Sequence, residues 1–179
     1  MLLATIRKTA LALSVVGLLA SFGARADESV AAAPDESPTL VHRVVNQATA
    51  SVASVQDVLG KALDLIGIRY RRGGTSPETG FDCSGFVNHV FKEGLGLYLP
   101  HNAKQISKEG EAVSKNELQP GDLVFFNTMR RAFSHVGIYL GDNKFVHAPR
   151  SGGAVRVEDM NESYWKKRFN GARRIAADE

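Results

Sequence analysis

Three residues of this 179-residue chain are of the types that carry out nucleophilic catalysis: Cys83, which is the single cysteine, and the histidines His135 and His147. A thiolate attacks carbonyl carbon, and an imidazole beside it can take the thiol proton and later deliver it to a leaving group. A second imidazole bonded to the far nitrogen of the first fixes its tautomer and orientation. These residue types indicate acyl transfer by a thiol, provided that the fold brings them together.

Cys83 lies in the segment GFDCSGFV, where a helix is expected to begin. Asp82 is a typical N-cap residue, and the apolar residues from Phe86 to Phe91 fall on one helical stripe. The macrodipole and the free amide hydrogens at a helix start favour a thiolate, and the same amides can hold an oxyanion. We therefore expect the Cys83 sulfur to be ionised. A buried, unreactive thiol is the alternative.

The two histidines lie on the two arms of a predicted β-hairpin, HVGIYLGDNKFVHA. A three-residue loop, 141–143, keeps the apolar residues of both arms on one face and pairs Ile138 with Val146. His135 and His147 then share the other face, with ~7–8 Å between their backbones. Two histidines could also bind a metal, but no third ligand stands nearby and carboxylates are absent from that face. A site without metal or cofactor is therefore favoured.

The other histidines are expected in surface or capping positions. His42 lies in the predicted leader, and His101 lies in a loop. His89 is about 240° around the predicted helix from Cys83, so it points elsewhere.

The first 26 residues are typical of a secretory signal peptide. Arg7 and Lys8 precede a short apolar run, and residues 24–26 have the small-x-small form of a signal-peptidase site, so we expect cleavage after Ala26 and a periplasmic location. An uncleaved anchor is the alternative, but the run is shorter than the ~20 residues of a membrane span. Since this segment accounts for the formal net charge of +3, the pI of 9.1 does not indicate nucleic-acid binding.

Composition and periodicity divide the remaining chain into two parts. Residues 27–53 are predicted to be a flexible leader, because DESVAAAPDESPTL is acidic and rich in alanine, serine and proline. Residues 54–179 are predicted to form one domain. A helix from Ser54 to Gly67 and the helix at Cys83 precede strands in DLVFF, the hairpin, AVRV and ARRI, with a short basic helix in SYWKKRF. This order predicts an α+β fold.

The segments GFDCSGFV, SHVGIYLG and FVHAP, together with GIRYRRGG and PGDLVFF, resemble the NlpC/p60 family of cell-wall cysteine peptidases. The resemblance runs from about Ser54 to Ile175. It implies a papain-like α+β fold in which N-terminal helices pack on a central antiparallel β-sheet. It also implies a catalytic triad of Cys83, His135 and His147.

The resemblance implies further roles near the thiol. Tyr70 matches the family's conserved tyrosine beside the oxyanion site, and Asp82 and Ser84 are expected on the oxyanion and substrate-binding side. His101 departs from the family pattern, since similar relatives often read Leu-Pro-Arg there. This departure could alter substrate contacts but leaves the triad intact.

The implied substrates are the peptide stems of peptidoglycan, cleaved by a monomeric enzyme. A small exported member of this kind is expected to cut the D-alanyl–meso-diaminopimelate cross-link, and the γ-D-glutamyl–diaminopimelate bond is the alternative. The arginines at positions 69, 71, 72 and 150 could contact stem carboxylates or form a solvated face. Two other classes stay open, a non-catalytic wall-binding protein and a thiol-linked dimer or redox sensor that uses Cys83.

Overall fold

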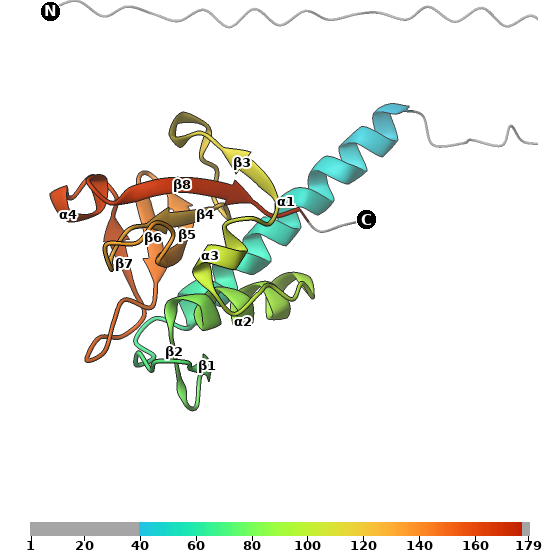
Figure 1. Ribbon diagram of the computed structural model, residues 1–179. Helices are drawn as coiled ribbons and strands as arrows, with labels where there is room; N and C mark the ends of the chain where they lie inside the picture. Colours follow the sequence, from blue (N-terminus) through green and yellow to red (C-terminus); the bar gives the residue numbers. More distant parts are fainter. Residues whose placement is uncertain (1–39, 177–179) are drawn as a thin grey trace, which may run out of the picture. The chain divides into compact units, whose positions relative to one another are not determined.

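The computed structural model describes residues 40–176, so the predicted signal peptide and residues 27–39 of the predicted leader lie outside the described residues. Figure 1 shows the arrangement of the helices and strands. In chain order they are α1 (Leu40–Asp64), β1 (Thr75–Ser76), β2 (Gly80–Phe81), α2 (Cys83–Leu95), α3 (Ala103–Ile106), β3 (Glu111–Val113), the 3₁₀ helix η1 (Lys115–Glu117), β4 (Leu123–Phe126), β5 (His135–Gly141), β6 (Lys144–His147), β7 (Arg156–Asp159), α4 (Ser163–Lys166) and β8 (Phe169–Arg174).

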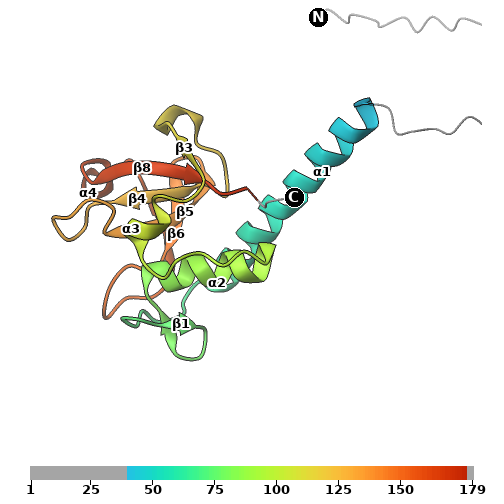
Figure 2. The same cartoon turned by 45° about the vertical axis from the view of Figure 1, so that its right-hand side comes forward.

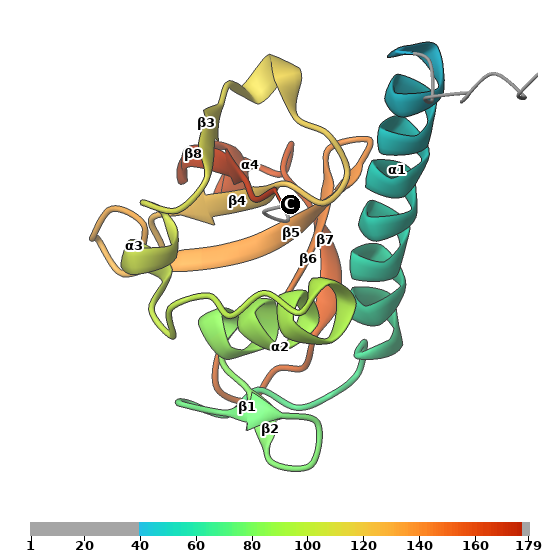
Figure 3. The same cartoon turned by 90° about the vertical axis from the view of Figure 1, so that its right-hand side faces the viewer.

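Six of the described strands form one antiparallel sheet in the order β3-β8-β4-β5-β6-β7, and β1 pairs with β2 in a separate small sheet. Helix α2 lies across one face of the large sheet, and α1 stands beside α2 (Figure 3). Buried apolar residues of α1, α2 and the large sheet form one core cluster, for example Val58, Val90 and Ile138. The predicted α+β fold, with N-terminal helices packed on an antiparallel sheet, is confirmed.

A second buried cluster covers the opposite face of the sheet. Val124 and Phe126 of β4 belong to it, together with Phe145 of β6 and Trp165 of α4. Helix α4 lies next to the start of β8, on the far side of the sheet from α2 (Figure 2). Both faces of β4 are therefore covered, and this explains why its sequence is a continuous apolar run instead of an alternating one.

The first helix begins at Leu40 and not at Ser54. The prediction of a flexible leader is therefore wrong for residues 40–53, because Val41, Val45 and Val52 continue the helical spacing toward the N-terminus and no proline interrupts it. These three side chains are exposed. None of the helices between residues 40 and 176 combines the length and the apolar character that crossing a bilayer requires.

Strands β5 and β6 form the predicted hairpin, and Ile138 pairs with Val146 as expected. The turn differs, because its loop holds only Asp142 and Asn143, with φ of 48° and 58°. Aspartate and asparagine tolerate this left-handed conformation better than other side chains. A register shift before Gly141 places an extra residue in β5, so the apolar faces of the two strands still match.

Candidate active site

The beginning of α2 is built around Asp82, whose backbone is extended, with φ −90° and ψ 176°. Its Oδ1 accepts hydrogen bonds from the Gly85 N–H at 2.7 Å and from the Ser84 hydroxyl at 3.0 Å. Its Oδ2 accepts a bond from the Gly73 N–H at 3.0 Å. Asp82 is therefore the N-cap, and Cys83 is the first helical residue, as predicted.

The first turn of α2 packs directly against the preceding loop at Gly85. A Cβ on this residue would lie 2.0 Å from the Gly74 carbonyl oxygen and 2.9 Å from His101 Nε2, so only glycine fits. His101 Nε2 also lies 3.3 Å from Asp82 Oδ1. The histidine that departs from the family pattern thus contacts the helix cap.

His135 and His147 lie at the ends of paired strands with their rings on the same face of the sheet. Nε2 of His135 is 2.7 Å from Nδ1 of His147, and both side chains are buried. Trp165 stacks on the His135 ring with 5.7 Å between centroids. Gly137 leaves room for the pair, because a Cβ there would lie 3.1 Å from His147 Cβ. The predicted placement of both rings on one face is confirmed.

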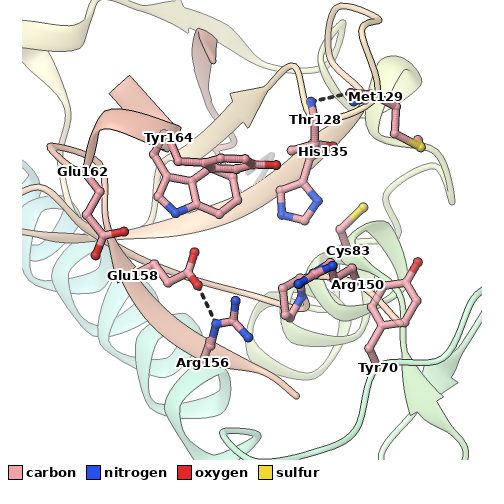
Figure 4. A pocket seen from close by; sticks show the side chains of 13 residues that line it. Tyr70, Cys83, Thr128, Met129, His135, Arg150, Arg156, Glu158, Glu162 and Tyr164 are labelled. Atoms are coloured by element: carbon pink, nitrogen blue, oxygen red, sulfur yellow. Dashed lines mark hydrogen bonds and ion pairs between the residues drawn. The ribbon is translucent and has the colours of Figure 1, made fainter. Parts of the chain in front are cut away.

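A cleft of about 600 Å³ is lined by Cys83 and by His135, the first histidine of this pair. Figure 4 shows the Cys83 sulfur and the His135 imidazole facing the cleft. The backbone N–H of Val136, the residue after His135, hydrogen-bonds the sulfur, so the thiol lies next to the start of β5. The other cleft-lining residues include Tyr70, Ser134, Arg150, Arg156, Glu158, Glu162, Tyr164 and Trp165.

Glu158 of β7 is a functional candidate that the sequence interpretation missed. Its Oε2 lies 3.2 Å from His147 Nε2. Its Oε1 accepts a bond from Arg156 Nε at 2.5 Å, which Figure 4 shows as a dashed line. The prediction that no carboxylate stands on the histidine face is wrong, because β7 pairs with β6 and brings Glu158 there. The signal was the spacing of Arg156 and Glu158, which places both on one face of a strand.

Burial determines the charge state of the thiol and its base. Burial, and secondarily the Asp82 carboxylate, raise the pKa of Cys83 to about 11 although three backbone N–H groups oppose them. Burial and the neighbouring His147 lower the pKa of His135 to about 3. The resting site is therefore a neutral thiol beside a neutral imidazole. Burial thus opposes the ionised sulfur that the sequence predicts, because desolvation disfavours a thiolate more than the helix start favours it.

Tyr70, Asp82 and Ser84 were expected on the oxyanion and substrate-binding side, but only Tyr70 lines the cleft. Burial raises the pKa of the Tyr70 hydroxyl, so that it remains a hydrogen-bond donor. Asp82 and Ser84 do not line the cleft and bond each other inside the helix cap, and their contact with substrate stays a prediction. A carboxylate surrounded by amide donors is already satisfied there.

The geometry of the histidine pair is that of a hydrogen bond. Two nitrogens bound to one zinc ion would lie ~3.4 Å apart, given Zn–N bonds of ~2.0–2.1 Å at a tetrahedral angle. Within residues 40–176 no group of three histidine, cysteine, aspartate or glutamate side chains is arranged to hold a metal ion.

The charge state predicts how Cys83 reacts with iodoacetamide. Because the thiolate is the reactive form, the alkylation rate is expected to rise about tenfold for each pH unit until the pH approaches about 11. Mass spectrometry of the intact protein measures this rate, and the single thiol makes the modified site unambiguous. A rate that is already constant below neutral pH would show a preformed thiolate and contradict the neutral resting pair.

Comparison with known proteins places this site in a family. A model described as the NlpC/P60 family matches residues 67–174, more than half of the chain. The murein DD-endopeptidase MepS/murein LD-carboxypeptidase of Escherichia coli is 42% identical over 147 residues, which cover 74% of this chain and 77% of that protein. The gamma-DL-glutamyl hydrolase of Bacillus subtilis is 44% identical over 129 residues, which cover 72% of this chain and 30% of that protein. A crystal structure of an NlpC/P60 family protein from Bacillus cereus superposes with a TM-score of 0.63 at 34% identity, covering 67% of this chain and 39% of that one.

Proposed function

Because the chain belongs to the NlpC/P60 family, it is a cysteine peptidase of the peptidoglycan-hydrolase type, and we propose that it cleaves the D-alanyl–meso-diaminopimelate cross-link between stem peptides. One observation carries the proposal: the thiol at the start of α2 borders the same cleft as His135, whose ring is hydrogen-bonded to His147. The choice of bond is supported by the E. coli relative, whose name is murein DD-endopeptidase.

In the proposed mechanism, His135 acts as a base at the moment of attack. The Cys83 thiol proton moves to Nδ1 of His135 while the sulfur bonds to the carbonyl carbon, since Nε2 is already bonded to His147. The Cys83 amide and the Tyr70 hydroxyl hold the oxyanion. The proton on His135 then passes to the amine as the C–N bond breaks, which leaves a thioester.

Water completes the proposed reaction. It gives a proton to His135 Nδ1 as its oxygen bonds to the thioester carbon, and the C–S bond then breaks. The proton returns from His135 to the sulfur, and the carboxylic acid product leaves. Every proton is accounted for within the chain and the substrate.

A second bond is supported by a specific observation. The relative from B. subtilis is named gamma-DL-glutamyl hydrolase, so the γ-D-glutamyl–diaminopimelate bond is the alternative substrate of the same cleft. The stem peptides that contain either bond carry carboxylates, which arginines could bind. Of the four arginines named from the sequence, Arg150 lines the cleft and those at positions 69, 71 and 72 do not, whereas Arg156 lines it without having been predicted.

Purified peptidoglycan sacculi distinguish the two bonds. If the cross-link is cut, mass spectrometry is expected to show cross-linked muropeptides replaced by monomers with intact stems. If the γ-D-glutamyl bond is cut, the stems on the glycan become dipeptides and diaminopimelate-containing peptides are released. An unchanged muropeptide profile would contradict both reactions and favour a wall-binding or thiol-sensing protein. A thiol-sensing protein would run as a reducible dimer on a non-reducing gel.

We also propose that the protein acts in the periplasm as a monomer after cleavage behind Ala26. The proposed substrate lies outside the cytoplasm, and the pattern of residues 1–26 is that of an export signal.

A further inference from the structure

Glu158 is connected to the thiol's base through one intervening ring. In the β6–β7 ladder His147 lies opposite Arg156, and Glu158 lies two residues further along β7, so the three side chains share a face. Glu158 Oε2 is 3.2 Å from His147 Nε2, and His147 Nδ1 is 2.7 Å from His135 Nε2. The order of contacts is therefore carboxylate, imidazole and imidazole, and the second imidazole lines the same cleft as the thiol.

His147 needs this carboxylate because the ring is fully buried. Its Nε2 is shielded from water and has no hydrogen bond of standard geometry within residues 40–176, so its polar partner is Glu158 Oε2 at 3.2 Å. A buried polar atom without any partner is costly. Arg156 holds the carboxylate in place from its other side, through the bond from Nε to Glu158 Oε1.

Glu158 is ionised at neutral pH. Burial alone would raise the pKa of Glu158, but the contact with His147 and the hydrogen bond from Arg156 lower it to about 2. Burial lowers the pKa of His147 and of His135, so both rings are neutral. An ionised carboxylate only accepts hydrogen bonds, whereas a neutral imidazole carries one donor and one acceptor nitrogen.

An acceptor-only carboxylate and two neutral imidazoles leave one arrangement of hydrogens along Glu158, His147 and His135. His147 must carry its hydrogen on Nε2, facing Glu158, so its Nδ1 is an acceptor. His135 must then carry its hydrogen on Nε2, because this atom meets the His147 acceptor. Nδ1 of His135 is left with the free lone pair that a base for the Cys83 thiol requires.

We propose that Glu158 is a positioning residue that acts through His147 to hold His135 in the tautomer with hydrogen on Nε2. The consequence for catalysis rests on the proposed function, whereas the tautomers themselves do not. Without Glu158, His147 can place its hydrogen on Nδ1, and His135 then presents an N–H to the thiol where a lone pair is needed. Glu158 does not contact the reacting atoms.

Kinetics with three variants test the inference. Glu158→Ala removes the acceptor and is expected to lower kcat for muropeptide release about 10–100-fold with KM changed less than about twofold, as for other carboxylates that orient a histidine. Glu158→Gln keeps a single acceptor oxygen, which can serve His147 Nε2 only at the expense of the bond from Arg156 Nε, so its loss is expected to be smaller than that of the alanine variant. Asp159→Asn is the matched control, because it removes a carboxylate charge from the next residue of β7 and Asp159 does not line the cleft.

Nitrogen-15 NMR of histidine-labelled protein provides a readout that needs no substrate. Wild type and Glu158→Gln are expected to show hydrogen on Nε2 of His135 and His147, and Glu158→Ala is expected to show a changed or mixed tautomer. Thermal unfolding checks each variant, and if the alanine protein does not fold, the glutamine variant carries the test.

The outcomes separate this inference from the proposed function. Unchanged tautomers and unchanged kcat in Glu158→Ala would overturn the role of Glu158 while leaving the peptidase intact. An equal loss in the alanine and glutamine variants, with the tautomers of wild type in both, would show that Glu158 acts through its charge, and would overturn its role in setting the tautomer. If wild type itself releases nothing from sacculi, the proposed function fails and the spectra still decide the tautomers.

Discussion

Replacing Cys83 with alanine is expected to lower the rate of muropeptide release from sacculi by about 10⁴-fold or more, to the background of the assay. The chain contains no second thiol that could substitute, and the sulfur is the atom that forms the covalent intermediate in the proposed mechanism. The initial rate of release, followed by chromatography of soluble muropeptides, measures the effect.

The fold of this variant is expected to be intact. Cys83 is half-buried, and the helix start depends on the Asp82 carboxylate and the Gly85 amide, which the substitution leaves in place. The thermal unfolding midpoint of the variant is the control. A folded Cys83→Ala protein that still releases muropeptides would refute the thiol mechanism.

Replacing His135 with alanine is expected to have the second largest effect, a loss of about 10²–10⁴-fold in kcat, because general-base catalysis contributes that much. His147→Asn is expected to lose less, since His147 acts through His135 and an asparagine oxygen can still accept the bond from His135 Nε2. Steady-state rates on the same sacculi compare the two variants.

His89→Ala is the matched control for the loss of a histidine. His89 packs on the Phe81 ring, with 5.1 Å between centroids, and does not line the cleft. Its removal should leave kcat unchanged. A His135→Ala protein that is folded and as active as His89→Ala would exclude His135 as the base.

Local sequence signals were sufficient to place the proposed catalytic residues within their helix and strands. An N-cap aspartate before an apolar helical stripe puts Cys83 in the first turn of α2. The period of two along β5 and β6 puts both imidazoles on one face, and this held although the loop has two residues and not three. Both histidines stay on one face because the apolar faces of the two strands must match. The bulge in β5 compensates for the shorter loop.

The helix boundary shows where composition was a poor guide. The acidic, proline-containing segment before Leu40 led to the prediction of a leader that extended through residue 53, although valines at helical spacing were already present there. Periodicity is the stronger signal, since it reflects the geometry that the backbone must adopt.

The sequence by itself determined the fold class and the elements that carry Cys83, His135 and His147, because helix caps and strand periodicity are encoded over a few neighbouring residues. Only the tertiary structure decided which side chains complete the site and in what charge state. Glu158 reaches His147 through the pairing of β7 with β6. Burial raises the pKa of the Cys83 thiol and lowers that of His135, and the degree of burial depends on contacts between segments far apart in the chain.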